Sequence, residues 1–188
     1  VLNRPGKLNA LTKPMWQALG TAIDGLSADA SLRCIILRGA GDKSFSPGND
    51  IAEFAVERAN KAQAIDYGRI MHATARALAG CRHPLVAQIH GICVGGGLEI
   101  AMAADLRIAR KGGGKVGLPE VTLGVLPGTG GTQRLVRIVG KSRAIELMVT
   151  GRLFSFEDAL GYGIVDSIIE GDDFMGQVHE YAKQFCPP

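Results

Sequence analysis

Short apolar runs alternate with helical patterns along most of this chain, and this alternation limits the possible folds more than any other feature. The apolar runs are rich in β-branched residues and are typical of buried strands. They predict strands over residues 32–37, 85–90, 105–109 and 164–169. Apolar residues at helical spacing predict helices over residues 12–26, 59–79, 98–104, 132–140, 142–149 and 174–185, and one that begins at residue 155 and ends at 161 or 163. The alternation favours an α/β fold over a helical bundle or a β-sandwich.

The length of 188 residues is typical of one domain with a sizeable core, so we expect residues 1–188 to form a single domain. Glycine occurs 26 times, about twice its usual share, without the triplet period of a collagen. The glycines are therefore expected to serve local backbone geometry.

Charge and hydropathy exclude several kinds of partner. The 21 lysines and arginines are scattered and give a net charge of only +3, so no basic stripe for nucleic acid is present. An anionic small molecule fits better. Residues 89–104 are the longest apolar stretch, but His90 and Glu99 interrupt it, which argues against a membrane span. No secretory signal is visible, and we expect a cytoplasmic protein, or one of the mitochondrial matrix if the source is a eukaryote.

The cysteines do not predict a metal site or a disulfide framework. They lie far apart, without a C-x-x-C pair or histidines at metal-ligand spacing, at Cys34, Cys81, Cys93 and Cys186. We expect free buried thiols and no bound metal. A serine hydrolase is also disfavoured, because no G-x-S-x-G motif accompanies the histidines.

Residues 91–99 are the most informative part of the sequence. They combine the exit of a strand, three consecutive glycines at 95–97 and the start of a helix that carries Glu99 in its first turn. Glycine lets a backbone approach a ligand closely, and free N–H groups at the start of a helix can stabilise negative charge. A tight packing turn, with Glu99 serving only the helix dipole, explains the same residues about equally well.

Two other loops could contribute to the same site. Residues 45–51 follow the first strand, although an ordinary Pro-Gly turn explains this segment by itself. Glu120 lies among apolar residues ahead of the glycine-rich turn 128–131, so burial is expected to raise its pKa and suit it to proton donation. No lysine precedes Thr129 or Thr132 as a phosphate-binding loop requires, and the third glycine of a dinucleotide fingerprint is missing.

Five motifs follow one another along the chain. They are LNRP with LNAL at residues 2–11, FSPGNDI at 45–51, GGGLE at 95–99, LPE at 118–120 and PGTGGTQRL at 127–135. In this order they resemble the enoyl-CoA hydratase/isomerase (crotonase) superfamily, and most closely its 2-enoyl-CoA hydratases. The resemblance covers nearly the whole chain.

The resemblance implies a crotonase-like spiral of ββα units and an acyl-CoA thioester substrate, with no cofactor beyond the coenzyme A of that substrate. The backbone N–H groups of Asn49 and Gly96 would form an oxyanion hole, in which preformed donors stabilise an enolate oxygen. Glu99 would activate a water and Glu120 would deliver a proton. Further contacts to the substrate are expected from Pro47, Asp50, Ile51, Ala52 and Gly128, and the Gly128 N–H could hold the water. A homotrimer or a pair of trimers is also implied.

The chain departs from the family pattern at several places. Asn49 stands where many members have alanine, which keeps the backbone donor and adds a polar side chain near the pocket. Ala52 replaces a lysine that would contact the nucleotide of coenzyme A, and Lys7 could compensate. Residues 112–114 lengthen a loop by about one residue. An N-terminal hairpin and C-terminal helices of the family are expected to be missing from these 188 residues.

Four functions are compatible with these residues. A hydratase, which adds water reversibly and syn across the 2,3 double bond of a 2-enoyl-CoA in fatty-acid or related degradation, is preferred because both acids are present. An isomerase that shifts the double bond would not depend on Glu99. A noncatalytic CoA-thioester or RNA-binding protein of the same fold fits the two acids and the scattered charge less well. A dehydratase of a carnitinyl or hydroxyacyl thioester follows from the reversibility of hydration.

Overall fold

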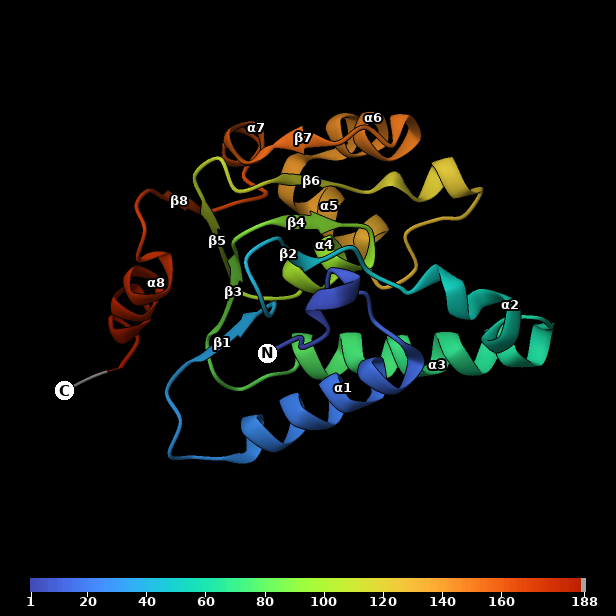
Figure 1. Cartoon of the computed structure of the whole chain (residues 1–188), viewed down its shortest axis with the longest axis horizontal. Coiled ribbons are helices and arrows are strands. Elements are labelled where there is room, and N and C mark those ends of the chain that lie inside the picture. Colours follow the sequence, from blue (N-terminus) through green and yellow to red (C-terminus); the bar gives the residue numbers. More distant parts are fainter. Residues whose placement is uncertain (187–188) are drawn as a thin grey trace.

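The first six strands alternate between two four-stranded sheets in the computed structural model, which describes residues 1–186 (Figure 1). The first sheet is parallel and contains, in spatial order, β1 (Ile35–Arg38), β3 (Leu85–Ile89), β5 (Leu106–Arg110) and β8 (Ser167–Ile169). The second contains β2 (Ser44–Ser46), β4 (Ile92–Val94), β6 (Lys115–Gly117) and β7 (Phe154–Ser155), and only its β6–β7 pair is antiparallel.

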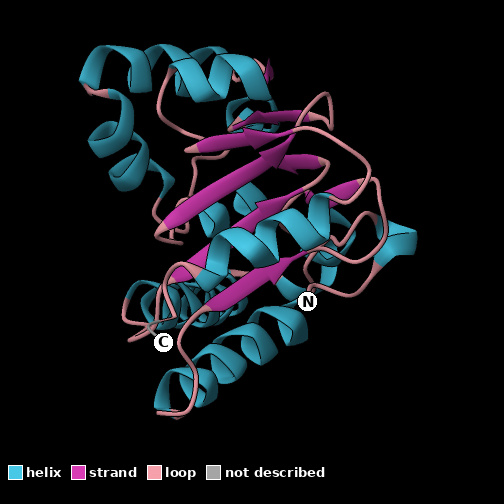
Figure 2. Cartoon of the chain, turned by 90° about the vertical axis from the view of Figure 1, so that its left-hand side faces the viewer, coloured by secondary structure: helices cyan, strands magenta, loops and turns pink. Residues whose placement is uncertain are grey.

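Consecutive strands form pairs with one member in each sheet, and a helical segment follows each pair. After β1 and β2 come α2 (Phe54–Glu57) and α3 (Lys61–Ala79), and after β3 and β4 comes α4 (Gly96–Ala101). After β5 and β6 the chain continues into α5 (Gly131–Val139). This repetition is the predicted ββα spiral, and helices flank the strands on both sides (Figure 2). The α/β prediction is confirmed.

The remaining helices cover the sheets. Helix α1 (Lys13–Ala28) packs along α3, as Figure 1 shows, and α8 (Phe174–Lys183) lies against β3 of the first sheet. Helices α6 (Lys141–Thr150) and α7 (Phe156–Gly161) lie beside the second sheet. Three short 3-10 helices are η1 (Pro5–Lys7), η2 (Ile51–Glu53) and η3 (Pro119–Leu123). Side-chain caps begin several of these helices, among them Thr12 at α1 and Asn60 at α3.

The predicted elements differ from the structure mainly at their ends. Strand β1 begins at Ile35 rather than at residue 32, and β8 begins at Ser167 rather than at residue 164, although Ile164 and Val165 are buried. Helix α4 occupies Gly96–Ala101 rather than residues 98–104. Apolar composition marked these segments as buried but did not show where hydrogen-bonded pairing starts.

The second sheet was not predicted strand by strand, and this is a correction to the sequence interpretation. Its strands have two or three residues, too few to display an alternating period, and β2 overlaps the segment that was interpreted as a loop. Glycines make its close packing possible. The carbonyl oxygens of Lys43 and Ser46 lie against Gly91 and Gly97, where a Cβ has no room.

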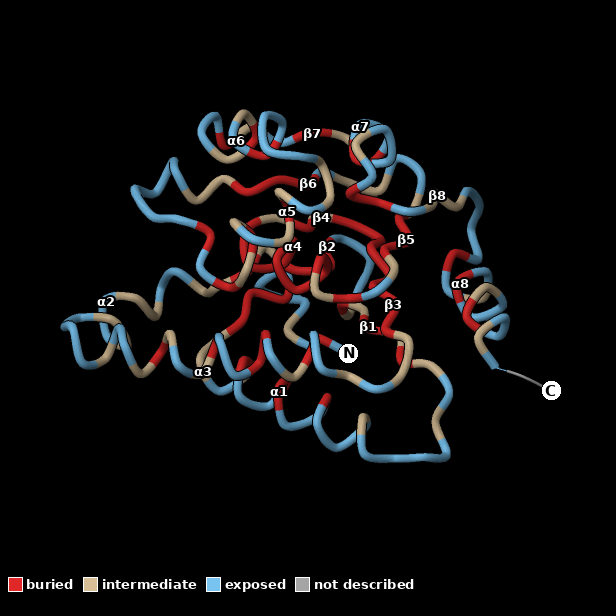
Figure 3. Tube along the Cα trace, turned by 180° about the vertical axis from the view of Figure 1, so that it is seen from behind, coloured by how far each residue is buried: buried red, intermediate tan, exposed pale blue. Residues whose placement is uncertain are grey.

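Burial is concentrated in the middle of the molecule (Figure 3). Strand β3 and helix α4 are buried along their whole lengths. Of the four free cysteines only Cys93 is buried, since Cys34 and Cys81 are half-buried and Cys186 is exposed, so the prediction of buried thiols is wrong for three of them. Within residues 1–186, no helix is long and apolar enough to cross a membrane. The predicted domain 1–188 includes two residues outside this range.

Candidate active site

Two backbone N–H groups meet where the loop after β2 touches the first turn of α4. Gly48 has a φ of +87°, and a Cβ built on it would lie 2.5 Å from the Gly96 nitrogen, so only glycine permits this approach. The neighbouring N–H group belongs to Asn49. Among the described residues, no backbone or side-chain acceptor takes a hydrogen bond from the N–H of Asn49 or of Gly96. The structure thus brings the two predicted oxyanion donors together, with both donors free.

The side chain of Asn49 is fixed by a hydrogen bond from Trp16. The indole Nε1 of Trp16 donates a 2.7 Å hydrogen bond to Asn49 Oδ1, and Trp16 is completely buried. The same indole packs against Gly96, the other donor residue. A Cβ built on Gly96 would lie 3.4 Å from Trp16 Cζ2. Trp16 was interpreted only as a core residue, and no motif connects it to Asn49, 33 residues further on.

Glu99 lies on α4 with only 2% of its surface exposed. Its Oε1 accepts two backbone hydrogen bonds of 2.7 Å, from the N–H groups of Thr129 and Gly131. Burial raises the pKa of this carboxyl, while the two backbone donors and the Arg134 guanidinium oppose that rise. The glycine-rich turn therefore holds Glu99 and leaves its second oxygen without a hydrogen bond to the described residues.

Glu120 sits in η3 and has a different environment. Its Oε2 is buried and has no hydrogen-bond partner in the described part of the chain. Burial raises the pKa of Glu120 to about 7, and the nearby Glu99 carboxylate adds to the rise. This agrees with the pKa direction expected from the apolar sequence around Glu120.

Both acids and both donor residues line one cavity of about 110 Å³. Of the residues predicted to contact substrate, Pro47, Ile51 and Gly128 also line it, whereas Asp50 and Ala52 do not. Asp50 instead forms a 2.6 Å ion pair with Arg4 and caps η2, so it holds the loop. The lining residues that were not predicted are Phe54, Arg58, Met71, Gly95, Pro119, Leu123, Val125 and Leu126. Gly95 and Pro119 belong to the motifs at 95–99 and 118–120, whereas the other six lie outside the quoted motifs and had no sequence signal.

The turn that holds Glu99 is itself anchored by two helices. His72 Nε2 of α3 lies 2.9 Å from the carbonyl oxygen of Gly128, and Arg134 Nη1 of α5 donates a 2.9 Å hydrogen bond to the carbonyl oxygen of Thr129. The carbonyl groups of Gly128 and Thr129 contact α3 and α5, and the N–H groups of Thr129 and Gly131 point towards Glu99. No group of three or more potential metal ligands clusters anywhere in residues 1–186.

A two-sheet ββα spiral of this kind, with two acids in its cavity, defines the class of crotonase-fold enzymes. A family model described as enoyl-CoA hydratase/isomerase matches residues 1–187, and the chain belongs to this family.

Known relatives and structures agree with that membership. The short-chain-enoyl-CoA hydratase of Clostridium acetobutylicum is 37% identical over 183 residues, 97% of this chain and 69% of that protein. The crotonyl-CoA hydratase of Syntrophomonas wolfei is 34% identical over 181 residues, 96% of this chain and 68% of that protein. The crystal structure of an enoyl-CoA hydratase/carnithine racemase from Magnetospirillum magneticum has a TM-score of 0.92 at 38% identity, covering 97% of this chain and 68% of that one.

Proposed function

We propose that this protein is an enoyl-CoA hydratase that adds water across the 2,3 double bond of a 2-enoyl-CoA thioester. The observation that carries the proposal is the pair of carboxyl groups in one cavity with unlike surroundings. Glu99 is tied by two backbone donors, and Glu120 has a buried, unpartnered oxygen. Hydration needs two such groups, because a proton leaves water as it attacks C3 and a proton arrives at C2.

The free N–H groups of Asn49 and Gly96 suit the carbonyl oxygen of the thioester. Attack at C3 moves an electron pair through the conjugated system onto that oxygen, and donors fixed in advance stabilise the resulting enolate. Such a donor can be worth about 2.7 to 4 kcal/mol of barrier.

The proton balance assigns a role to each acid. Glu99 takes a proton from the water whose oxygen bonds to C3, and Glu120 gives its proton to C2, so the net addition is one hydrogen and one hydroxyl. A pKa of about 7 leaves much of Glu120 protonated near neutral pH. Gly128, Pro47 and Ile51 are proposed to contact the water or the substrate, and the reaction needs no cofactor beyond the coenzyme A of the thioester.

An isomerase is the second candidate, and the state of Glu120 favours it. A carboxyl group with a pKa of about 7 and no hydrogen-bond partner could shuttle one proton between C4 and C2 alone. That reaction would not require Glu99.

The decisive experiment follows the absorbance of the conjugated thioester when crotonyl-CoA is added to the wild type, Glu99→Gln and Glu120→Gln. We expect each variant to lose hydration by about 10² to 10⁴-fold, since each removes one proton-transfer group. Glu146→Gln, which alters an acid on α6 outside the cavity, serves as a control with unchanged rate. Full hydration by Glu99→Gln would refute the role assigned to Glu99, and a wild type that does not hydrate crotonyl-CoA would refute the hydratase.

Assembly and location are part of the same proposal. Exposed apolar residues at the cavity mouth, such as Leu126 with 79% exposure, support a homotrimer or pair of trimers in which a neighbouring chain covers them. We place the enzyme in the cytoplasm, or in the mitochondrial matrix of a eukaryote.

A further inference from the structure

Arg58 is the only cationic side chain that lines the reaction cavity within residues 1–186. It follows directly on α2, at the point where the chain turns towards α3. The same cavity holds both acids and both N–H donors, so a substrate bound there lies within a chamber that contains one fixed positive charge.

The guanidinium group of Arg58 is held by aromatic rings and a thioether rather than by a carboxylate. Its Cζ lies 4.4 Å from the ring centroid of Phe54 and 4.4 Å from that of Tyr67. Its Nη2 donates to the sulfur of Met71 at 3.3 Å. These contacts restrict the plane of the guanidinium but supply no full counter-charge.

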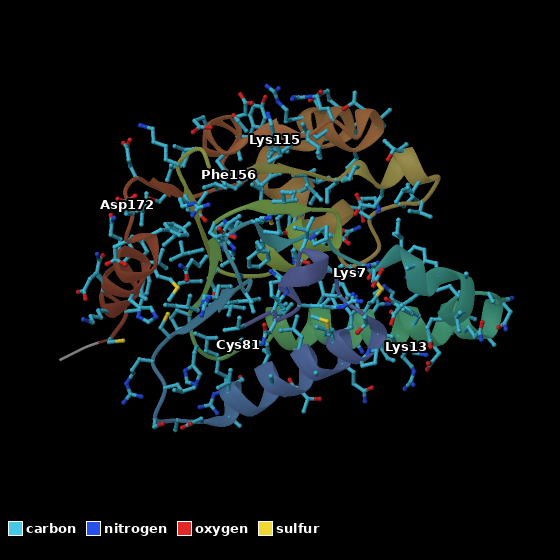
Figure 4. All side chains as sticks on the ribbon, in the orientation of Figure 1. Lys7, Lys13, Cys81, Lys115, Phe156 and Asp172 are labelled. Atoms are coloured by element: carbon cyan, nitrogen blue, oxygen red, sulfur yellow. The ribbon has the colours of Figure 1, made fainter. Side chains whose placement is uncertain are left out.

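Arg58 makes no ion pair with any residue in the described part of the chain, and its buried Nε has no acceptor there. Acids close to Arg58 along the chain have other partners, and Glu53 Oε2 accepts a 2.8 Å hydrogen bond from the backbone N–H of Lys13. Lys13, which Figure 4 labels at the start of α1, pairs with Glu57 at 2.9 Å and with Asp66 at 3.0 Å. A partly buried cation without an anion is costly, and a bound anion removes that cost.

Other lining residues limit the kind of anion. Met71, Leu123 and Val125 present apolar atoms to the cavity, which suit the carbon atoms of an acyl chain. Neither Glu99 nor Glu120 is within ion-pair distance of Arg58, so a substrate can meet the acids at one part of its chain and Arg58 at another. A cavity of about 110 Å³ suits a short chain.

We propose that Arg58 binds a carboxylate at the far end of the acyl chain, so that the preferred substrate is the mono-CoA thioester of a short unsaturated dicarboxylic acid. This inference rests on the proposed function for the placement of the thioester at Asn49 and Gly96. The planar guanidinium offers parallel N–H donors that match the two oxygens of a carboxylate. Arg58 is thus a specificity-determining residue.

The test compares binding of two unreactive thioesters of equal chain length, glutaryl-CoA and pentanoyl-CoA, by isothermal titration calorimetry. They differ by a carboxylate in place of a terminal methyl group. We expect the wild type to bind glutaryl-CoA at least about tenfold more tightly, the gain of one charge-assisted contact. Equal affinities, or a preference for pentanoyl-CoA, would overturn the proposal.

Variants show whether Arg58 causes the preference for glutaryl-CoA. Arg58→Met keeps an unbranched side chain without charge and is expected to remove the preference while changing the affinity for pentanoyl-CoA by less than about threefold. Arg69→Met, which alters an exposed arginine of α3 outside the cavity, is expected to keep the preference. A preference that survives in Arg58→Met excludes Arg58 as its origin. If Arg58→Met does not fold, Arg58→Lys takes its place. We expect it to show a reduced preference for glutaryl-CoA, because an ammonium group lacks the planar pair of donors of a guanidinium. An unchanged preference in Arg58→Lys would contradict the proposal.

The binding test is independent of the reaction. A wild type that prefers glutaryl-CoA but does not hydrate glutaconyl-CoA or crotonyl-CoA would disprove the hydratase and support the role of Arg58. A wild type that hydrates crotonyl-CoA but shows no preference for the carboxylated thioester would disprove only the role of Arg58.

Discussion

At the residue scale, the two acids of the cavity differ in what surrounds their oxygens. Glu99 is almost fully buried, yet two backbone N–H groups stabilise its charge, whereas Glu120 has a buried oxygen with no partner among the described residues. Desolvation therefore dominates at Glu120 and raises its pKa to about 7. Such a difference separates a group that accepts a proton from one that donates it.

The raised pKa of Glu120 predicts an effect on stability. The folded protein holds this proton up to about pH 7, and the unfolded chain releases it near the ordinary value of 4.5. The folded state therefore binds more protons in this window, and stability falls as the pH rises through it. Glu120→Gln removes that loss, so at pH 8 we expect it to be more stable than the wild type by on the order of 1 to 3 kcal/mol, although inactive. Urea denaturation at pH 5 and pH 8 measures this, and an equal pH dependence in both proteins would contradict it.

Trp16 carries a second prediction at this scale. Trp16→Phe keeps a ring behind Gly96 but removes the N–H that holds Asn49 Oδ1. Because the donor loop loses its support, we expect kcat to fall about tenfold, the equivalent of 1.4 kcal/mol, with little change in KM. Trp16 is the only tryptophan, so the single indole N–H resonance in an NMR spectrum reports the hydrogen bond directly.

A double-mutant cycle with Asn49→Ala separates this role from general packing. Once the Asn49 side chain is absent, Trp16→Phe should have little further effect on kcat. Additive losses would show that Trp16 acts only as a core residue, and an indole resonance unchanged by Asn49→Ala would show that the bond does not form.

At the scale of elements, the site is assembled by contacts between segments that are distant in sequence. The loop after β2 meets the start of α4 only because Gly48 leaves room for the Gly96 backbone. Side chains of α3 and α5 contact the carbonyl groups of Gly128 and Thr129. The N–H group of Thr129 then donates to Glu99 on α4. The second sheet places β2 and β4 side by side, so both donor segments leave neighbouring strands.

Arg134 is the residue with which this assembly can be tested. Arg134→Met removes the hydrogen bond to the Thr129 carbonyl and the positive charge that lowers the pKa of Glu99. We expect kcat to fall about tenfold. We also expect the acidic limb of the kcat/KM profile to move to higher pH, since a base with a higher pKa ionises later. Arg137→Met, on the exposed side of α5 with its guanidinium on Gln133, should leave the profile unchanged. An unmoved acidic limb in Arg134→Met would contradict the assigned coupling.

At the scale of the whole molecule, the cavity mouth is bordered by apolar side chains that the described residues leave open. Leu123 and Leu126 are 58% and 79% exposed, and both also line the cavity. Exposed apolar groups clustered at a site are typical of surfaces that another chain covers.

The expected assembly can be measured by light scattering after size-exclusion chromatography. We expect the mass of three or six chains, and Leu126→Glu should shift the population towards single chains because it places a charge in the covered surface. Leu160→Glu on α7, which lies outside the cavity lining, is the matched control. A wild type that elutes with the mass of one chain would disprove the assembly.

Much of the fold and part of the site could be predicted from short stretches of sequence. The helical spacing around Trp16 and the β-branched run before Gly39 each reflect neighbours along the chain, and they indicated α1 and β1. Motif order placed Glu99 and Glu120 among the candidates for one site. The position of the Arg58 guanidinium in the cavity and the Trp16–Asn49 hydrogen bond were not predicted. No local sequence pattern around Arg58 or Trp16 indicates which residue its side chain contacts.

Local patterns were enough to predict the alternation of strand and helix, the α/β class and Glu99 and Glu120 as candidates, since periodicity and motif are properties of adjacent residues. The second sheet, the free donor pair, the turn that holds Glu99 and the unpaired charge of Arg58 became visible only in the folded chain. Thr129 donates to Glu99 across 30 residues, and a contact of that kind depends on the path of the whole chain. Burial depends on that path too, so the raised pKa of Glu120 follows from how the chain folds around it.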